Sequence, residues 1–515
     1  MYHARNFFKG GAQVSGEPPV FDLFIIGGGI NGCGIARDAA GRGLSVSLVE
    51  QGDFASATSQ WSTKLIHGGL RYLEYYEFRL VAESLREREV LLKAAPHLIA
   101  PLQFILPHEP HLRPRWMIAA GMRLYDMLGG KKSMPKSRAV QLADSPLSAG
   151  LKPGYTHGFS YYDARADDAR LTLANARGAA DLGATLAPRT RFVSAVARDG
   201  AWKITLEDVS TSRCSEQQAK MLVNAGGPWV AQVLRDIKGV TQQAGVKHVR
   251  GSHIVVPRLH EGEHAYILQN PDKRIIFIIP YQGAYSLIGT TDIPVDEYAH
   301  PRISQDEIDY LCQAASAYTA RPVRPADVAW SYSGVRPLYD DGGADAAAIT
   351  RDYVLELNQS GGAPLLNIFG GKLTTYRRLA EHALEKLQAH FPRMGGSWTQ
   401  GKPLPGGDFA GGLSDLIAEI ARSHPYVPVE HLPGIARRHG STALRWLKNA
   451  GSLEGLGTYF GAGLYECEIS HMITDEWALT AEDVLWRRSK CGLMMTGPER
   501  ERVAAYVAGR TAGVM

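Results

Sequence analysis

The chain has 515 residues, of which 45% are hydrophobic and 21% are charged, and its formal net charge is +4 at pH 7. This length exceeds the roughly 250–300 residues that one hydrophobic core usually serves, so we expect two or three domains. The mild net charge gives no reason to expect a nucleic-acid partner, and no apolar stretch approaches the roughly 18 residues that a membrane-spanning helix needs.

The first 20 residues lack the apolar stretch of a secretory signal peptide, so we interpret them as a loosely ordered lead-in. The five cysteines are scattered along the chain, odd in number and without a C-x-x-C pair. This pattern predicts neither a disulfide framework nor a metal centre, and it is typical of a protein in a reducing cytoplasm.

Residues 22–50 combine an apolar run, three glycines in G-x-G-x-x-G spacing (Gly27, Gly29, Gly32), a helix of small residues and a second apolar run that ends at Glu50. In a βαβ dinucleotide site the first glycine makes a tight turn, the second lets a pyrophosphate approach the backbone, and the third lets the helix lie close to the strand. The helix N-terminus would face the phosphates, and the terminal carboxylate would accept hydrogen bonds from a ribose. These flanking elements make a plain glycine-rich turn the weaker interpretation.

A polar loop with many small residues follows this unit. Its hydroxyl and ammonium groups, and the backbone at its glycines, can contact a bound cofactor, whereas the alternative interpretation is an ordinary surface loop. Its position directly after the nucleotide-binding unit favours the cofactor interpretation. The candidate residues are Ser56, Thr58, Ser59, Ser62, Thr63, Lys64, His67, Gly68 and Gly69.

Residues 78–93 have apolar side chains at helical spacing and alternating charges on the opposite side, which predicts an amphipathic helix. The next segment, 111–138, is locally basic, with seven Lys or Arg residues, one acid and an apolar side that begins with Trp116. A helix of this kind can lie on anionic lipid. A core-facing helix with a solvated basic flank explains the same residues equally well, so both interpretations stay open.

The middle of the chain alternates between expected helices and strands. A helix is predicted over 165–182, a hairpin over 191–206 with its turn at Asp199-Gly200, and an apolar strand over 221–230 that runs back under the cofactor. Short strands and turns over 248–291 predict an antiparallel sheet in a second domain.

In the last third, strands over 330–338 and 349–357 are expected to return to the first domain. Residues 367–387 have the pattern of a strand, a Gly-Gly turn and a helix. A Pro/Gly-rich tract over 391–412 predicts a linker, and residues 413–515, rich in Ala, Leu, Glu and Arg, are expected to be helical.

Two segments carry a family resemblance: IGGGINGCGIARDAAGRG at 26–43 and GGKLTTYRRLA at 370–380. With GGLRY, GSHIVVP, IGTTD, YSGVRPL and ITRDY, they resemble the FAD-dependent glycerol-3-phosphate dehydrogenases of the aerobic, quinone-linked bacterial type, over nearly the whole chain from residue 20. Two small departures are the bulky pair Gln60-Trp61, where small residues are usual, and a glycine after Asn224-Ala225-Gly226, where threonine is common.

The resemblance implies an α/β fold (α+β overall) with a Rossmann-like FAD-binding domain, an antiparallel-sheet substrate (cap) domain and a C-terminal helical domain. The expected boundaries are 1–20 for the lead-in, 21–77, 150–245 and 335–390 for the FAD-binding domain, 78–149 and 246–334 for the substrate domain, 391–412 for the linker and 413–515 for the helical domain.

The implied reaction is the oxidation of sn-glycerol 3-phosphate to dihydroxyacetone phosphate, with a hydride passing to FAD and electrons then passing to a membrane quinone. The implied location is cytoplasmic, on the inner face of the plasma membrane, with an anionic lipid surface as a partner. A homodimer is compatible with the resemblance.

The resemblance also implies site residues. Arg71, Arg336 and Arg351 are the candidates for a phosphate clamp, because forked guanidinium donors match phosphate oxygens, and Tyr72 adjoins them. The candidates for FAD binding are Gly27, Gly28, Gly29, Asn31, Gly32, Glu50, Thr58, Ser59, Ser62, Thr63, Lys64, His67, Gly68, Gly69, Ala225, Gly226, Gly371, Lys372, Leu373 and Thr374.

Three residues are assigned catalytic roles. His253 is a candidate general base, because the unperturbed pKa of histidine lies near working pH, although a histidine beside a strand is otherwise more often structural. Lys372, after the Gly-Gly turn, can stabilise negative charge on the reduced flavin or on the developing alkoxide. A lysine on the first turn of an exposed helix is the plainer alternative. Arg336 is expected to act in both binding and catalysis.

Other functions remain open at this point. A glycerol-3-phosphate oxidase that makes hydrogen peroxide could use the same scaffold, and so could an amine- or hydroxyacid-oxidising flavoenzyme of the glycine-oxidase type. A flavin-binding interaction protein without turnover would leave His253, Lys372 and the arginines without a role.

Overall fold

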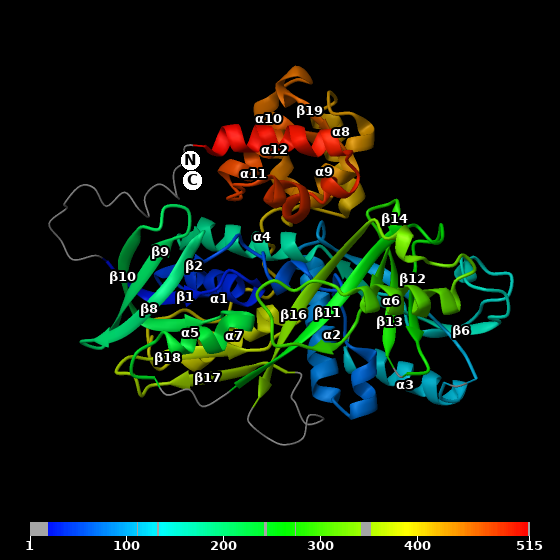
Figure 1. Ribbon diagram of the computed structural model, residues 1–515, viewed down its shortest axis with the longest axis horizontal. Helices are drawn as coiled ribbons and strands as arrows, with labels where there is room; N and C mark the ends of the chain where they lie inside the picture. Colours follow the sequence, from blue (N-terminus) through cyan, green and yellow to red (C-terminus); the bar gives the residue numbers. More distant parts are fainter. Residues whose placement is uncertain are drawn as a thin grey trace.

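The computed structural model describes residues 19–110, 112–130, 133–240, 245–272, 274–340 and 352–512. The described chain forms a body of two sheets that lie side by side, with a helical C-terminal part above them in Figure 1. The predicted α/β architecture, with a Rossmann-like part, a second sheet and a C-terminal helical part, is confirmed.

The first sheet has a parallel centre, as a dinucleotide-binding unit requires. Its main strands are, in spatial order, β17 (Val354–Asn358), β18 (Leu365–Phe369), β10 (Cys214–Asn224), β1 (Val20–Ile26), β2 (Val46–Glu50) and β7 (Thr185–Pro188), and an antiparallel hairpin of β8 (Thr190–Arg198) and β9 (Ala201–Asp208) joins β10. The predicted hairpin turn is present, with φ of 52° at Asp199 and 78° at Gly200.

Both faces of the first sheet are covered, which explains the continuous apolar runs of its strands. Leu23 and Ile25 of β1 pack in one cluster with α1 (Ile30–Gly41), α4 (Asp168–Asp181) and α7 (Tyr376–Leu387). Phe24 and Ile26 point to the opposite face, where they pack with α5 (Val230–Arg235) and the β8–β9 hairpin. All four side chains are buried.

The second sheet is mostly antiparallel, as predicted for residues 248–291. Its strands are β15 (Ile293–Pro294), β11 (Gly245–Pro257), β14 (Tyr285–Gly289), β13 (Ile275–Tyr281), β12 (Ala265–Gln269), β4 (Ile99–Pro107), β6 (His157–Ala166) and β3 (Leu65–Ile66), with β16 (Trp330–Asp340) paired to β11 and β5 (Arg138–Gln141) paired to β6. One face packs with α6 (Gln305–Tyr318), and the other packs with α2 (Phe78–Ala94) and α3 (Arg115–Leu128).

The C-terminal part has its own hydrophobic clusters and is helical, as predicted, apart from one short hairpin. Its elements are α8 (Leu413–Ser423), α9 (Leu432–His439), α10 (Ala443–Ala450), β19 (Tyr459–Gly461), β20 (Leu464–Tyr465), α11 (Glu466–Thr474), the π-helical η11 (Asp483–Arg488) and α12 (Gly497–Thr511). The short 3₁₀ helices of the described chain are η2 (Thr58–Gln60), η3 (Leu70–Tyr75), η4 (Pro146–Ser148), η5 (Gly227–Trp229), η6 (Pro325–Asp327), η8 (Val429–His431), η9 (Gly440–Thr442), η10 (Glu454–Leu456) and η12 (Cys491–Leu493).

Three strands differ from the sequence-based assignment. Residues 157–166, expected within the FAD-binding domain, form β6 and pair with β4 in the second sheet, and β3 joins the same sheet. The sequence places residues 335–340 in the FAD-binding domain, but they belong to β16, which pairs with β11 over its length. These errors share a cause: a strand's sheet is decided by partners that are distant in sequence, whereas the local pattern shows only that a strand forms.

Candidate active site

The glycine turn after β1 has the close contacts that the motif requires. Gly27 has φ of +112°, and a Cβ on this residue would lie 2.5 Å from the Ala225 carbonyl oxygen. A Cβ on Gly32 would lie 2.0 Å from the carbonyl oxygen of Gly27, so only glycine lets α1 pack here. The N-cap residue of α1, Gly29, makes no side-chain capping hydrogen bond, and the first turn of the helix has no acidic residue. The positive end of the helix dipole at this turn suits a pyrophosphate.

Glu50 lies at the carboxyl end of β2 beside this turn. One carboxylate oxygen accepts a hydrogen bond from the Gly28 N–H and the other from the Gly52 N–H, each at 2.7 Å. Burial raises the pKa of the Glu50 carboxyl, although the two backbone amides oppose that shift. Each carboxylate oxygen keeps further lone-pair capacity, which suits the hydroxyl groups of a ribose.

The polar loop after Glu50 uses several of its side chains within the protein. The Thr58 hydroxyl donates to the Val335 carbonyl oxygen at 2.6 Å, and Ser59 Oγ accepts from the Ile30 N–H at 2.9 Å. These two contacts join the loop to β16 and to the start of α1.

Ser62 and Lys64 bind the same carboxylate of Asp168, at the start of α4. Ser62 Oγ donates to Asp168 Oδ2 at 2.7 Å, and the Lys64 ammonium donates to Oδ1 at 2.9 Å. The predicted direct contact of these two side chains with the cofactor therefore competes with a buried ion pair, and their geometry favours a role in fixing the loop.

His253 lies on β11 and is 2% exposed. Its Nε2 lies 3.0 Å from the Thr63 hydroxyl, its ring stacks on Tyr332 with 4.8 Å between centroids, and its Nδ1 is buried without a partner among the described residues. Burial, with Lys64 and Arg336 nearby, lowers the pKa of His253 to about 3. The unperturbed pKa expected for His253 from the sequence therefore does not hold in the folded protein. The ring is neutral at physiological pH.

The Gly-Gly turn before α7 meets the start of α1. Gly370 and Gly371 have φ of 71° and 99°, and a Cβ on Gly371 would lie 2.6 Å from Asn31 Nδ2. The same Nδ2 donates to the Gly370 carbonyl oxygen at 3.1 Å, while Asn31 Oδ1 is buried without a partner in the described chain. The turn also reaches the polar loop, because Thr374 Oγ1 accepts from the His67 N–H at 3.2 Å. Leu373 is partly buried at the same turn.

The remaining predicted cofactor residues lie at the edges of this site. Gly68 is buried and its N–H donates to the Tyr125 hydroxyl at 3.0 Å, and Gly69 adopts the left-handed conformation with φ of +74°. Ala225 follows β10 directly under Gly27, and the Gly226 N–H donates to Asn224 Oδ1 at 3.3 Å.

The predicted phosphate clamp is only partly described. Arg336, on β16, has a side chain that is 45% exposed, and its guanidinium lies 3.1 Å from Asp292 Oδ1 and 3.3 Å from the Thr291 carbonyl oxygen. Arg351 and the side chain of Arg71 lie outside the described residues, so the three-arginine clamp stays a prediction.

The arrangement fits FAD on three observations. The start of α1 has no acidic residue in its first turn, the glycines allow the close packing that the nucleotide-binding turn requires, and two buried polar atoms, Asn31 Oδ1 and Lys372 Nζ, have no partner among the described residues. Gly27 to Gly32 and Glu50 would hold the pyrophosphate and ribose, and the turn at Gly371–Thr374 would lie beside the ring system.

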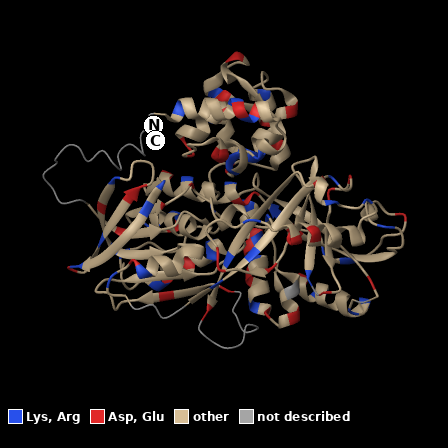
Figure 2. Cartoon of the chain, in the orientation of Figure 1, with Lys and Arg blue, Asp and Glu red and all other residues tan. Residues whose placement is uncertain are grey.

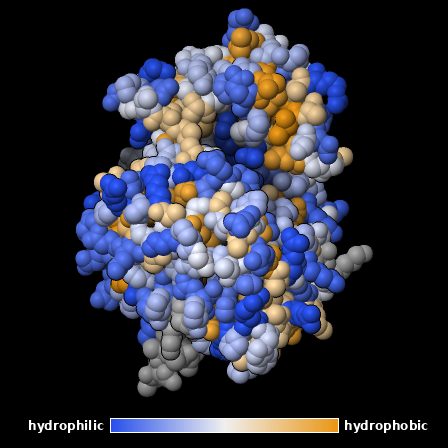
Figure 3. Space-filling model, turned by 90° about the vertical axis from the view of Figure 1, so that its right-hand side faces the viewer, coloured by the Kyte–Doolittle hydropathy of each residue, from blue (hydrophilic) through white to orange (hydrophobic). Residues whose placement is uncertain are grey.

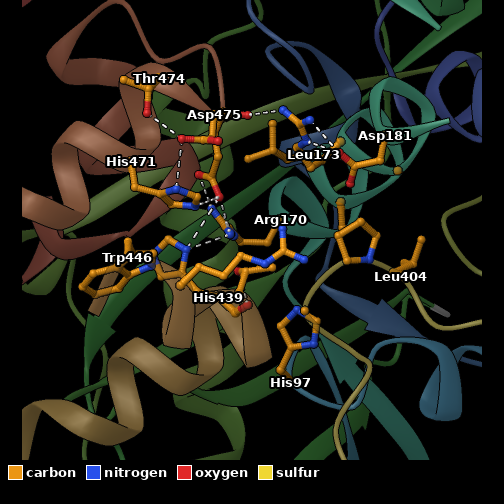
Figure 4. Close-up of a pocket in the computed structure, with 18 of the residues that line it drawn as sticks. His97, Arg170, Leu173, Asp181, Leu404, His439, Trp446, His471, Thr474 and Asp475 are labelled. Atoms are coloured by element: carbon orange, nitrogen blue, oxygen red, sulfur yellow. Dashed lines mark hydrogen bonds and ion pairs between the residues drawn. The ribbon is translucent and has the colours of Figure 1, made fainter. Parts of the chain in front are cut away.

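A large cavity of about 890 Å³ lies elsewhere, between α4 and the C-terminal helices (Figure 4). Within the described part of the chain, His439, His471 and Glu476 are close enough to share a metal ion. However, both carboxylate oxygens of Glu476 accept hydrogen bonds from the Arg170 guanidinium, at 2.6 and 2.8 Å. We therefore interpret the group as an ion-pair cluster.

Two residues near the site were missed from the sequence. Asp168 binds Ser62 and Lys64, and Tyr332 stacks on His253 while its hydroxyl donates to the Ser62 carbonyl oxygen at 2.8 Å. Asp168 follows the N-cap residue Asp167, a helix-start signal that suggests capping and not contact with a loop. Tyr332 has no local signal, because its role comes from the pairing of β16 with β11.

Comparisons with known proteins agree with this geometry. The FAD dependent oxidoreductase family model matches residues 22–377. The chain is 48% identical over 493 residues to the D-erythritol 1-phosphate dehydrogenase of Brucella abortus (strain 2308), covering 95% of this chain and 98% of that protein. It is 47% identical over 495 residues to the aerobic glycerol-3-phosphate dehydrogenase of Escherichia coli (strain K12), with the same coverage.

Among solved structures, the glycerol-3-phosphate dehydrogenase from Bacillus halodurans complexed with FAD matches with a TM-score of 0.74 and 26% identity, over 99% of this chain and 97% of that one. The recognised family, the fold and the FAD cofactor predicted from the sequence are thereby confirmed. The chain therefore belongs to the FAD-dependent oxidoreductases and, within them, to the group of flavoenzymes that includes the glycerol-3-phosphate dehydrogenases.

Proposed function

We propose that this protein oxidises sn-glycerol 3-phosphate to dihydroxyacetone phosphate. When bound, FAD supplies the acceptor for the hydride that leaves the secondary carbon. The observation that carries the proposal is the position of Arg336 on β16. Its half-exposed guanidinium reaches across to β11, where a Cβ on Gly251, two residues before His253, would lie 3.0 Å from Arg336 Nη2. A cation beside a buried, neutral imidazole suits an anionic substrate that must lose a proton.

The proposed roles follow from charge and exposure. Arg336, with Arg71 and Arg351, binds the dianionic phosphate and thereby fixes the position of the reacting carbon. His253 Nδ1, which has no partner among the described residues, accepts the hydroxyl proton. The Lys372 ammonium stabilises the negative charge that arrives with the hydride.

A second substrate is favoured by the comparison with the D-erythritol 1-phosphate dehydrogenase, which is as similar to this chain as the glycerol-3-phosphate enzymes are. Both substrates are phosphorylated polyols, so one arginine clamp serves either. The choice of substrate can be tested by measuring kcat/KM for glycerol 3-phosphate, D-erythritol 1-phosphate and glycine. We expect glycerol 3-phosphate to give the highest value, and glycine, the substrate type of glycine oxidases, to give none.

We further propose that electrons pass to a quinone at the inner face of the plasma membrane. No helix in the described ranges has the length and hydropathy needed to cross a bilayer, so the contact would be peripheral. α3 supports this contact: Met122 and Tyr125 are buried against the body, whereas Trp116 is 71% and Met127 is 76% exposed. Exposed basic side chains accompany them at Arg113, Arg115, Arg123, Lys136 and Arg138.

Two measurements test the acceptor and the membrane contact. Reoxidation of the reduced enzyme should be much faster with a soluble quinone than with air, and the reverse order would favour the oxidase. Trp116→Ser with Met127→Ser should weaken cosedimentation with anionic vesicles, because both side chains lie on the exposed side of α3. Equal binding of wild type and variant would contradict the proposed contact.

A further inference from the structure

One C-terminal segment makes buried ionic contacts with the FAD-binding part. Both carboxylate oxygens of Asp53, which is fully buried, accept hydrogen bonds from η11: Oδ1 from Arg488 Nη2 at 2.9 Å, and Oδ2 from Arg487 Nε at 2.7 Å and from Arg488 Nη1. Asp53 lies more than 400 residues from these partners in sequence. The contact therefore joins the two ends of the described chain.

Asp53 belongs to the short loop that follows β2 and supports the ribose end of the FAD site. Glu50 is three residues earlier, and its carboxylate also accepts from the Gly52 N–H. The ring of Phe54, the next residue, packs against Gly28, where an added Cβ would lie 2.7 Å from Phe54 Cδ1. Its ring also packs edge-on against Trp477 of the C-terminal part, with 5.1 Å between centroids. Phe54 therefore links Asp53 to the glycine turn through direct contact.

The same C-terminal segment makes a second contact at the other end of the site. The Lys490 ammonium, which is 4% exposed, donates to Asp167 Oδ1 at 2.5 Å. Asp167 caps the start of α4, and the next residue, Asp168, binds Ser62 and Lys64 of the polar loop. Lys490 thus supports the segment that carries Thr63, the partner of His253.

A cavity also lies at the boundary between the C-terminal part and the body. Figure 3 shows a recess between the C-terminal part and the body, and Figure 2 shows charged residues of both signs where the two meet. The cavity of about 890 Å³ lies on this boundary, with Arg170, His439 and His471 on its walls (Figure 4). Ionic and apolar contacts both join the two parts, for example the Arg170–Glu476 ion pair and the Phe54–Trp477 ring contact.

We propose that Arg487, Arg488 and Lys490, here called the C-terminal clamp, are positioning residues for FAD. They hold the loop at Asp53 and the start of α4, and through them the two stretches of chain that flank the cofactor. The C-terminal part then contributes to the FAD site, although the nucleotide-binding motif itself lies at Gly27–Gly32 in the N-terminal part. The proposal rests on FAD binding and not on the identity of the substrate.

The test measures the FAD dissociation constant of full-length apoprotein, prepared by removing the flavin, for Arg488→Gln and for a matched control, Arg438→Gln. Arg438 is also buried and also pairs with a carboxylate through two donors, but its partner, Glu468, lies within the C-terminal part. Both substitutions leave a buried carboxylate with fewer partners, so both should lower the unfolding temperature of the apoprotein.

The clamp predicts that Arg488→Gln raises the FAD dissociation constant about tenfold or more, whereas Arg438→Gln leaves it within about twofold of wild type. At saturating FAD, kcat of Arg488→Gln should return toward wild type, because no group that contacts substrate has changed. Equal dissociation constants for the two variants would overturn the proposal.

Two further variants keep the test decisive if Arg488→Gln does not fold. Arg488→Lys retains one charged donor to Asp53 and should give an intermediate FAD affinity. Lys490→Gln acts through Asp167 and should also weaken FAD binding, with the flavin absorbance spectrum altered by the shifted polar loop. Wild-type affinity and an unchanged spectrum in both variants would contradict the clamp.

Discussion

The Lys372 ammonium lies 4.2 Å from the centre of the Tyr72 ring and is buried without a hydrogen-bond partner among the described residues. A buried cation of this kind costs stability unless it meets negative charge. We therefore expect this charge to be stabilising when negative charge develops beside it during turnover.

This relationship predicts opposite effects of Lys372→Met on stability and catalysis. The unfolding free energy of the apoprotein should rise by about 1 kcal/mol, because an unpaired buried ammonium is removed. The rate of flavin reduction should fall by about 10²-fold, and the potential of the bound flavin should become more negative. Stopped-flow reduction and apoprotein unfolding measure the two effects, with Lys372→Arg as the charge-retaining control. A faster or unchanged reduction rate would refute the role of Lys372.

Arg336→Ala is expected to raise KM for glycerol 3-phosphate by about 10²-fold and to lower kcat, while FAD stays bound, because we propose that the guanidinium binds the substrate phosphate and not the nucleotide. Steady-state kinetics measure KM and kcat, and the flavin absorbance spectrum shows whether FAD stays bound. Arg274→Ala is a matched control: its side chain is 44% exposed and pairs with Asp272 at 2.8 Å, similar to the 45% and 3.1 Å of Arg336 with Asp292. Identical kinetics of the two variants would rule out the phosphate-binding role of Arg336.

Gly32→Ala should abolish FAD binding or weaken it at least tenfold, because the added Cβ would lie 2.0 Å from the Gly27 carbonyl oxygen and would push α1 from β1. Gly121→Ala, in helix α3, is the control. A Cβ there meets nothing within 4 Å, so that variant should be more stable by about 0.5–1 kcal/mol. Isothermal titration of apoprotein with FAD distinguishes the two, and wild-type affinity in Gly32→Ala would show that the contact can relax.

The buried histidines predict a loss of stability in mild acid. Burial lowers the pKa of His97 to about 3, and that of His253 to about 3, whereas both rings titrate near 6.5 in the unfolded chain. Below that value the unfolded chain binds protons that the folded protein does not, so stability is retained above pH 6.5 and falls as pH decreases toward 3. Each histidine should lower the unfolding free energy by about 1 kcal/mol when the pH falls from 7.5 to 5.5.

Urea unfolding of His97→Gln at the two pH values checks this prediction. The variant should lose less stability on acidification than wild type, whereas substitution of the exposed His300 by Gln should not change the pH dependence. Equal pH dependence in all three proteins would mean that His97 is protonated in the folded state.

The sequence predicted the elements whose cause is local. The spacing of Gly27, Gly29 and Gly32 identified the first turn, Asp199-Gly200 identified a hairpin, and apolar periodicity identified α2. Each of these depends on backbone conformation or on the burial of one face, which a short stretch of sequence determines.

What the sequence did not predict depends on contacts between distant residues. The assignment of β6 to the second sheet requires β4, and the low pKa of His253 requires the residues that bury it. The pairing of Asp53 with Arg488 has no local signal, because either residue alone has the pattern of a solvated surface charge. Such pairs are determined by the tertiary fold.

The decisive experiment mixes the purified holoenzyme anaerobically with glycerol 3-phosphate and follows the visible absorbance of the bound FAD. If the proposed reaction is correct, this absorbance bleaches rapidly, completely at excess substrate, and returns when a soluble quinone is added. Unchanged absorbance with glycerol 3-phosphate, in a protein whose flavin is bleached by dithionite, would contradict the proposed reaction.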